Sequence, residues 1–185
     1  MKKYLLIISI LILASCSQQQ GARRPISQSS GTFMKESVER NKKLVAGEEG
    51  QIAAIIKNSP EKKYIASKKG YWYSYINQNT TDTLSPKKGD IAYYDYEVTS
   101  LKGAVIYSTN ELASQTYYVD KEQKIIIGLR DGIKIMRKNE KVSFLFPSHM
   151  AFGYHGDNNK IGHNEPLIYT VTLTNFEKDP NPKTK

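Results

Sequence analysis

The sequence predicts an α+β domain in which an antiparallel sheet wraps around one short helix, with a helical extension in front of it. Two observations predict this class. Apolar and polar residues alternate with a period of two in several short stretches, which is typical of strands. Residues 33–57 instead carry apolar side chains at helical spacing, and residues 129–136 form the one short helical segment in the second half. The length of 185 residues leaves room for one domain of ordinary size.

The N-terminus has the features of an export signal. Two lysines precede the apolar residues 4–14, a stretch shorter than the roughly 20 residues that a membrane-spanning helix needs. Residues 1–15 therefore read as a signal peptide. An ordinary secretory signal that is followed by an incidental cysteine is the alternative interpretation.

The end of this signal resembles the lipobox of bacterial lipoproteins, in the residues Leu13-Ala14-Ser15-Cys16. This resemblance implies that the Cys16 thiol is alkylated by diacylglycerol before cleavage. Cys16 is the only cysteine of the chain, so no disulfide can form within it.

The chain between the cysteine and the sheet has two parts. Residues 16–32 are rich in Gln, Ser, Gly and Arg and predict a flexible tether. Residues 33–58 predict a helix that Gly47 and Gly50 weaken in the middle, at about 1 kcal/mol each relative to Ala. Its apolar stripe either docks on the domain or pairs with another copy of the chain. The stripe consists of Met34, Val38, Val45, Ile52 and Ile56.

Strands are predicted wherever the alternation is regular. In the clearest of them, Tyr94 and Tyr96 share one face, and Tyr93 and Asp95 share the other. Turns with Gly, Pro or Asn separate these stretches, and residues 178–185 form a polar tail. The predicted strands are 71–76, 91–98, 104–107, 141–146 and 167–174.

Composition and motifs argue against several function classes. The net charge is +9, but the lysines are dispersed among acidic residues, so a solvated surface is favoured over a nucleic-acid interface. No GxSxG, GxGxxG or phosphate-binding glycine loop is present. A metal site made of His155, Asp157 and His163 is conceivable but unspecific. No cofactor and no metal are expected.

Four segments in a fixed order resemble the FK506-binding (FKBP) family of peptidyl-prolyl isomerases. Tyr96 precedes the first, and Met136 follows the second. The resemblance covers about residues 70–176, and the domain is placed at residues 61–177. Together with the lipobox and the helical lead-in, it is most similar to the lipoproteins of this family that are associated with gliding motility. The segments are 102–109, 125–132, 146–153 and 161–169.

The family resemblance implies an FKBP-like half-barrel of antiparallel strands around one short helix, with an apolar cleft that takes proline-containing chains. In that cleft the X-Pro amide would be desolvated and twisted without an acid, base or nucleophile. The resemblance assigns catalysis to Tyr96, Ile126, Phe152 and Tyr169. It assigns substrate binding to Ile106, Tyr107, Tyr118, Ile125, Leu129 and Ile161. An aromatic stripe at strand spacing is also typical of a plain core.

Three positions depart from the family pattern. Tyr107 stands where the family has Asp, Phe152 where it has Tyr, and Leu129 where it commonly has Trp. Losing one neutral hydrogen bond costs about 0.5–1.5 kcal/mol, or about tenfold or less in rate. We therefore expect a weak isomerase; a non-catalytic peptide-binding subunit of a surface or motility assembly and a purely structural lipoprotein are the alternatives.

The expected location follows from the lipobox. The lipid on Cys16 would hold the protein in the cell envelope, on the periplasmic face of the outer or inner membrane. The expected partners are the membrane and proline-containing polypeptides, and nucleic acid is not among them. The sequence leaves the oligomeric state and the client proteins open.

Overall fold

The structure is a computed structural model that describes residues 31–121 and 124–181. The signal peptide, Cys16 and nearly all of the expected tether lie outside the described residues. Within them, no helix is both long and apolar enough to cross a membrane. The chain divides into two compact units, Met1–Val38 and Glu39–Lys185. Its elements are α2 (Gly31–Lys57), β1 (Ile65–Ala66), β2 (Trp72–Asn77), β3 (Asp90–Ser100), β4 (Val105–Tyr107), α3 (Thr109–Leu112), β5 (Gln115–Tyr118), α4 (Ile127–Ile135), β6 (Lys141–Phe146), the 3₁₀ turn η1 (Ser148–Met150) and β7 (Leu167–Lys178).

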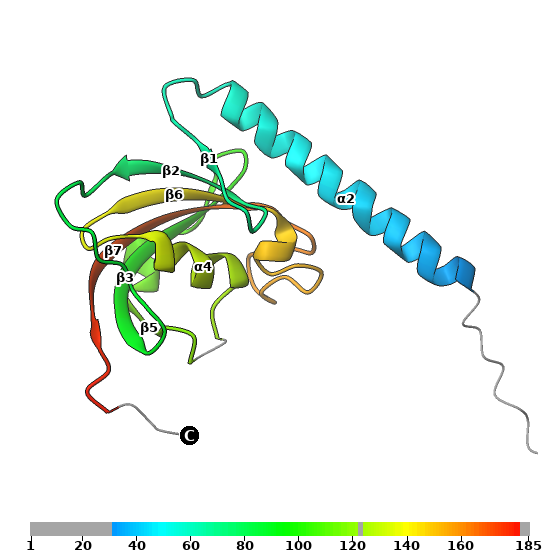
Figure 1. The fold of residues 1–185 in the computed structure, drawn as a ribbon. Coiled ribbons are helices and arrows are strands. Elements are labelled where there is room, and N and C mark those ends of the chain that lie inside the picture. The colour runs from blue at the N-terminus through cyan, green and yellow to red at the C-terminus, as the bar shows by residue number, and fades with distance from the viewer. Residues whose placement is uncertain (1–30, 122–123, 182–185) are drawn as a thin grey trace, which may run out of the picture. The chain divides into compact units, whose positions relative to one another are not determined.

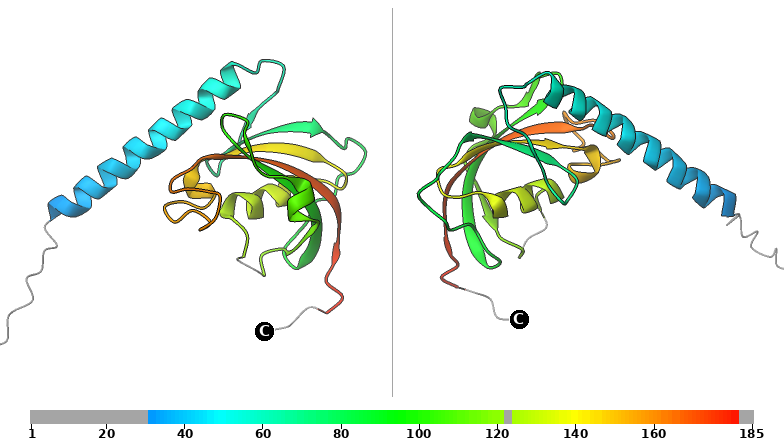
Figure 2. Two further views of the ribbon diagram at one scale, coloured as in Figure 1. Left: turned by 180° about the vertical axis from the view of Figure 1, so that it is seen from behind. Right: turned by 45° about the horizontal axis from the view of Figure 1, so that its top comes forward.

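The strands form one antiparallel sheet in the order β1-β2-β6-β7-β3-β4, and β5 pairs with β3 beside β4. The long strands β3 and β7 pair over their whole length, from Asp90 opposite Lys178 to Ser100 opposite Leu167. The sheet curves around α4, which lies across its concave face (Figures 1 and 2). This arrangement confirms the predicted antiparallel sheet around a short helix.

The core lies between the concave face of the sheet and α4. On β3 the residues Ala92, Tyr94 and Val98 are buried, while Tyr93 and Asp95 on the other face are more exposed, as the alternation predicts. Gly128 allows α4 to approach the sheet, because a Cβ atom there would lie 2.6 Å from the Phe146 ring. The helix is therefore fixed at a short distance from β6.

The helices differ from the prediction in their limits and number. The helix expected at residues 129–136 begins two residues earlier, because Gly128 belongs to the closely packed first turn of α4. The short elements α3, η1, β1 and β5 were not predicted, since each has only two to four residues. Such elements are too short to show a period in the sequence.

The predicted helical extension is present as α2, and Gly47 and Gly50 do not interrupt it. In the second unit Ile52 is completely buried and Val45 is half-buried, so this part of the helix is held by packing. In the first unit the described residues 31–38 are the beginning of α2, and Met34 is 64% exposed there. Within the second unit, the stripe residues Val45 and Ile52 are therefore packed on the domain.

Candidate functional site

Two aromatic rings from neighbouring strands form the centre of the candidate site. Tyr169 of β7 is buried, and Tyr96 of β3 is half-buried. Their ring centroids lie 5.6 Å apart and the ring planes differ by 8°, so the rings are stacked. Phe146 of β6 packs against Tyr169 at 5.6 Å and 60°. The period-two faces of three strands thus bring these aromatic side chains together.

Both phenols remain neutral over the physiological range. Burial is the main cause that raises the pKa of Tyr169, and the neighbouring Tyr96 adds to it. Burial also raises the pKa of Tyr96, with a smaller contribution from Tyr107. These hydroxyls can take part in hydrogen bonds, but neither is suited to act as a base near neutral pH.

Helix α4 and the segment before it contribute aliphatic side chains. Leu129 is buried in the core, and Ile125 and Ile126 are partly buried and pack against that core. Gly128 brings this end of α4 close to η1 as well, since an added Cβ would lie 2.9 Å from the carbonyl oxygen of Met150. The aliphatic part of the site and the loop after β6 are therefore neighbours.

The loop between β6 and β7 contributes Phe152 and Ile161. Ile161 is buried, whereas Phe152 is half-buried against the core. The carbonyl oxygen of Ser148 accepts hydrogen bonds from the backbone N–H groups of Ala151 at 2.9 Å and Gly153 at 2.8 Å. The backbone is thus fixed on both sides of Phe152.

A polar network connects Tyr107 with the same loop. The Tyr107 hydroxyl donates a short hydrogen bond to Asp157 Oδ2 and accepts one from Asn159 Nδ2 at 3.0 Å. Asp157 Oδ1 accepts from the backbone N–H groups of Asn159 and Ile161, both at 2.8 Å. The Lys160 ammonium lies 4.8 Å from the centroid of the Tyr107 ring. A carboxylate from the loop therefore meets the residue that stands in place of the family's Asp.

Opposing effects act on the pKa of Asp157. Burial, the largest single effect, raises it, but the hydrogen bonds from Tyr107 and from the backbone N–H groups of Ile161 and Asn159 together bring the pKa below its ordinary value. The same hydrogen bond is the main cause that raises the pKa of Tyr107, with burial second. The network therefore consists of an ionised carboxylate and a neutral phenol at neutral pH.

Two of the three residues in the metal site that the sequence left conceivable, Asp157 and His163, have other partners. Asp157 is engaged by Tyr107 and two backbone N–H groups, and His163 Nδ1 makes a short contact with the carbonyl oxygen of Tyr154. In the described part of the chain, no three His, Cys, Asp or Glu residues lie together in a way that could hold a metal ion.

Nine of the ten residues predicted for the site belong to one hydrophobic cluster or pack against it, and Tyr118 does not. On β5, Tyr117 pairs with Ala92 and is 1% exposed, whereas Tyr118 pairs with Ile91 on the opposite face. Tyr118 therefore lies on the other face of β5 from Tyr117, since neighbouring residues of a strand point to opposite faces. Its part in substrate binding stays a prediction. The nine are Tyr96, Ile106, Tyr107, Ile125, Ile126, Leu129, Phe152, Ile161 and Tyr169.

Sequence reasoning considered Asp157 only as a conceivable metal ligand and did not consider Asn159, so it missed both as neighbours of Tyr107. The signal available was their place in a loop rich in Gly and Asn between two predicted strands. That position indicates a turn but does not predict a hydrogen-bond partner for either side chain. Nothing in the spacing pointed to Tyr107, which lies 50 residues earlier.

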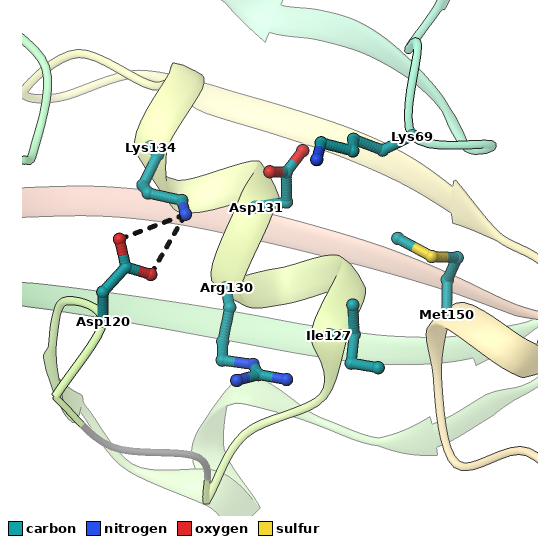
Figure 3. Close-up of a pocket in the computed structure, with 7 residues that line it drawn as sticks. All are labelled: Lys69, Asp120, Ile127, Arg130, Asp131, Lys134 and Met150. Atoms are coloured by element: carbon teal, nitrogen blue, oxygen red, sulfur yellow. Dashed lines mark hydrogen bonds and ion pairs between the residues drawn. The ribbon is translucent and has the colours of Figure 1, made fainter. Parts of the chain in front are cut away.

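Elsewhere on the domain, a surface pocket of about 210 Å³ lies beside α4 and contains none of the predicted site residues. Figure 3 shows Lys134 turned toward Asp120, and their charged atoms are 3.0 Å apart. Charges of both signs line this pocket together with Ile127 and Met150. The residues that line this pocket are mostly charged, unlike those of the apolar site, and the sequence predicted no function for them.

The chemistry that the apolar site can support follows from its composition. It offers aromatic and aliphatic surface and neutral phenols, and the nearby carboxylate of Asp157 is already hydrogen-bonded. Such a surface favours a group that becomes less polar as it reacts. An amide bond loses its resonance, and with it part of its charge separation, when it is twisted. A dry apolar site therefore favours the twisted amide over the planar one.

Comparisons with known proteins agree with the family resemblance found in the sequence. Residues 83–174 match the model of the family described as FKBP-type peptidyl-prolyl cis-trans isomerase. Over 151 residues the chain is 23% identical to the probable FKBP-type peptidyl-prolyl cis-trans isomerase FkpA of Neisseria meningitidis, covering 81% of this chain and 54% of that protein. It is 24% identical over 144 residues to the outer membrane protein MIP of Legionella longbeachae, covering 78% of this chain and 60% of that protein. The chain thus spans a little over half the length of these two relatives.

Solved structures show the same fold. FkpA from Escherichia coli has a TM-score of 0.60 at 21% identity, covering 97% of this chain and 84% of that one. The N-terminal domain of FKBP42 from Arabidopsis thaliana has a TM-score of 0.56 at 18% identity, covering 63% of this chain and 93% of that one. At these identities the likeness concerns the fold alone.

Proposed function

This chain carries a domain of the FKBP-type peptidyl-prolyl cis-trans isomerase family, and we propose that the domain catalyses rotation about X-Pro bonds in exported proteins. The observation that carries the proposal is the stacked pair Tyr96 and Tyr169. Ile126 and Phe152 are half-buried and pack against the same core. Uncatalysed isomerisation of an X-Pro bond takes tens to hundreds of seconds. It therefore limits the folding rate of proteins that must isomerise such a bond to fold.

The four residues proposed for catalysis act by contact and desolvation. Tyr96, Ile126, Phe152 and Tyr169 would hold the proline ring and keep water from the amide. The residues predicted for substrate binding would hold the flanking chain: Ile106, Tyr107, Tyr118, Ile125, Leu129 and Ile161. The reaction needs no proton transfer, since only resonance has to be lost.

The direct test is a protease-coupled assay on X-Pro peptides, with the rate compared with that of the uncatalysed reaction. We expect a measurable but modest acceleration, because Phe152 lacks the hydroxyl that the family's Tyr carries. The double variant Tyr107→Asp, Phe152→Tyr, which has the family residues at both positions, should be faster than the wild type. A wild-type rate equal to the uncatalysed one contradicts the proposed activity.

A second candidate function is peptide binding without useful turnover, in a subunit of a surface or motility assembly. The departures at Tyr107 and Phe152 favour it, and so does the Asp157 carboxylate, which is engaged by Tyr107. Binding of X-Pro peptides by a protein that does not accelerate isomerisation would support this second function.

We also propose that a lipid on Cys16 anchors the protein in the cell envelope. The support is the lipobox-like sequence before Cys16, together with the relative called outer membrane protein MIP. The Cys16→Ser variant should lose incorporation of labelled palmitate and move from the membrane fraction to the soluble fraction. Labelling that persists in this variant would contradict the anchor.

A further inference from the structure

Glu48 is one of the buried carboxylates in the second unit, and the sequence gives it no catalytic motif. Glu48 of α2 is 3% exposed. Its Oε2 accepts a hydrogen bond from the backbone N–H of Ser148 at 2.8 Å, and its Oε1 accepts one from Ser148 Oγ at 2.7 Å. Burial of a carboxylate is costly unless such partners are supplied. A single residue of η1 supplies both of them.

Ser148 links this carboxylate to the candidate site. While its N–H and hydroxyl groups donate to Glu48, its carbonyl oxygen accepts from Ala151 and Gly153. These two residues flank Phe152, which is proposed to contact substrate. The hydrogen bonds therefore form a continuous series from the N-terminal helix to the backbone on both sides of Phe152.

Packing holds Glu48 in this position. Ile52, one turn further along α2, is completely buried, and Val45, nearly one turn before it, is half-buried. Glu48 lies between them on the same face of the helix. Its neighbour Glu49 is exposed and provides a matched reference on the same helix.

We propose that Glu48 is a positioning residue of the peptide-binding surface, which acts through Ser148 on the backbone around Phe152. This inference rests on the proposed function, and it assigns to α2 a part in isomerisation rather than in tethering alone. Glu48 does not touch substrate; it fixes the loop whose aromatic side chain does.

The test compares Glu48→Ala, Glu48→Gln and Glu49→Ala in the full-length protein. Alanine removes both acceptors. Glutamine can still accept from the Ser148 N–H and can donate to Oγ, so it is the conservative replacement. Three quantities are measured for each variant: amide hydrogen exchange at Ala151 and Gly153, kcat/KM on an X-Pro peptide, and the thermal midpoint.

For Glu48→Ala we expect exchange at the two loop amides to become at least about tenfold faster, and kcat/KM to fall by about tenfold, since hydrogen bonds to a charged group have about this effect. Exchange in the paired strands β3 and β7 should stay within about threefold of the wild type. Glu48→Gln should restore most of both losses, and Glu49→Ala should match the wild type in all three measurements.

Two results overturn the inference. One is a Glu48→Ala variant with wild-type kcat/KM, and the other is a loss of exchange protection that is equal in the loop and in β3 and β7. Failure of the proposed function is seen separately. If the wild-type protein has no isomerase activity, the effect of Glu48 on the loop is still measured by amide exchange at Ala151 and Gly153 and by the affinity for the X-Pro peptide.

Discussion

Tyr96 and Tyr169 come from neighbouring antiparallel strands, and their rings lie almost parallel, 5.6 Å apart. Replacing Tyr96 by Leu removes the stacked ring, which is worth about 0.5–1.5 kcal/mol beyond its buried area. We expect kcat/KM on X-Pro peptides to fall by about tenfold. Tyr96→Phe keeps the ring and should stay within about threefold. Tyr93→Leu, on the other face of β3, is the control, and an equal loss there would argue against a specific role for Tyr96.

The Tyr107–Asp157 hydrogen bond predicts a titration that can be measured directly. Because the pKa of Asp157 is below its ordinary value of 3.8, the stability that this carboxylate adds is present above pH 3.8 and is lost as the pH falls through the lowered pKa. The amide proton shifts of Asn159 and Ile161, which donate to Asp157, should report this pKa in NMR titrations.

In the Tyr107→Phe variant the midpoint of that titration should move upward, since one of the hydrogen bonds that lower the pKa is lost. Tyr93→Phe is the matched control, because it removes a hydroxyl that donates to Glu177 at 2.8 Å. A midpoint that is the same in Tyr107→Phe and in the wild type would mean that this hydrogen bond does not form in solution.

Alanine substitutions at two glycines with positive φ can distinguish the cost of backbone strain from the cost of a steric clash. Gly103 has φ +84° and open space around an added Cβ, whereas Gly156 has φ +67° and its Cβ would lie 2.4 Å from the carbonyl oxygen of Ile161. We expect Gly103→Ala to lower the free energy of unfolding by about 1 kcal/mol and Gly156→Ala by about 3 kcal/mol. Urea denaturation measures both, and equal losses would contradict the close contact in the loop.

Buried phenols predict a loss of stability in alkali. Burial raises the pKa of Tyr94 and Tyr169 above the ordinary 10.0. Their contribution to stability is therefore complete below pH 10 and is lost as the pH rises further, because the unfolded chain ionises first. Absorbance at 295 nm should show these phenols ionising only together with unfolding, as followed by circular dichroism. Ionisation of all thirteen tyrosines while the protein remains folded would contradict this prediction.

Part of the fold could be predicted from local patterns. Tyr94 and Tyr96 alternate with Tyr93 and Asp95, and the structure places the first pair toward the core as expected. Periodicity made no prediction for β5, because its four residues show no clear alternation, and Tyr118 was assigned from the family resemblance. There Tyr117 faces inward and Tyr118 does not. An alignment of motifs does not fix which of these two tyrosines faces the core, because one residue more or less in the preceding turn reverses the face.

The faces of the longer strands, the helical extension and the order of segments that indicates the family could be read from the sequence, since each is encoded by residues close together in the chain. No local pattern predicted the hydrogen bonds between Tyr107 and Asp157 or between Ser148 and Glu48; both became visible in the folded chain. These partners lie 50 and 100 residues apart. The path of the loops and the packing of α2 bring them together, and a polar side chain leaves no periodic pattern that names its distant partner.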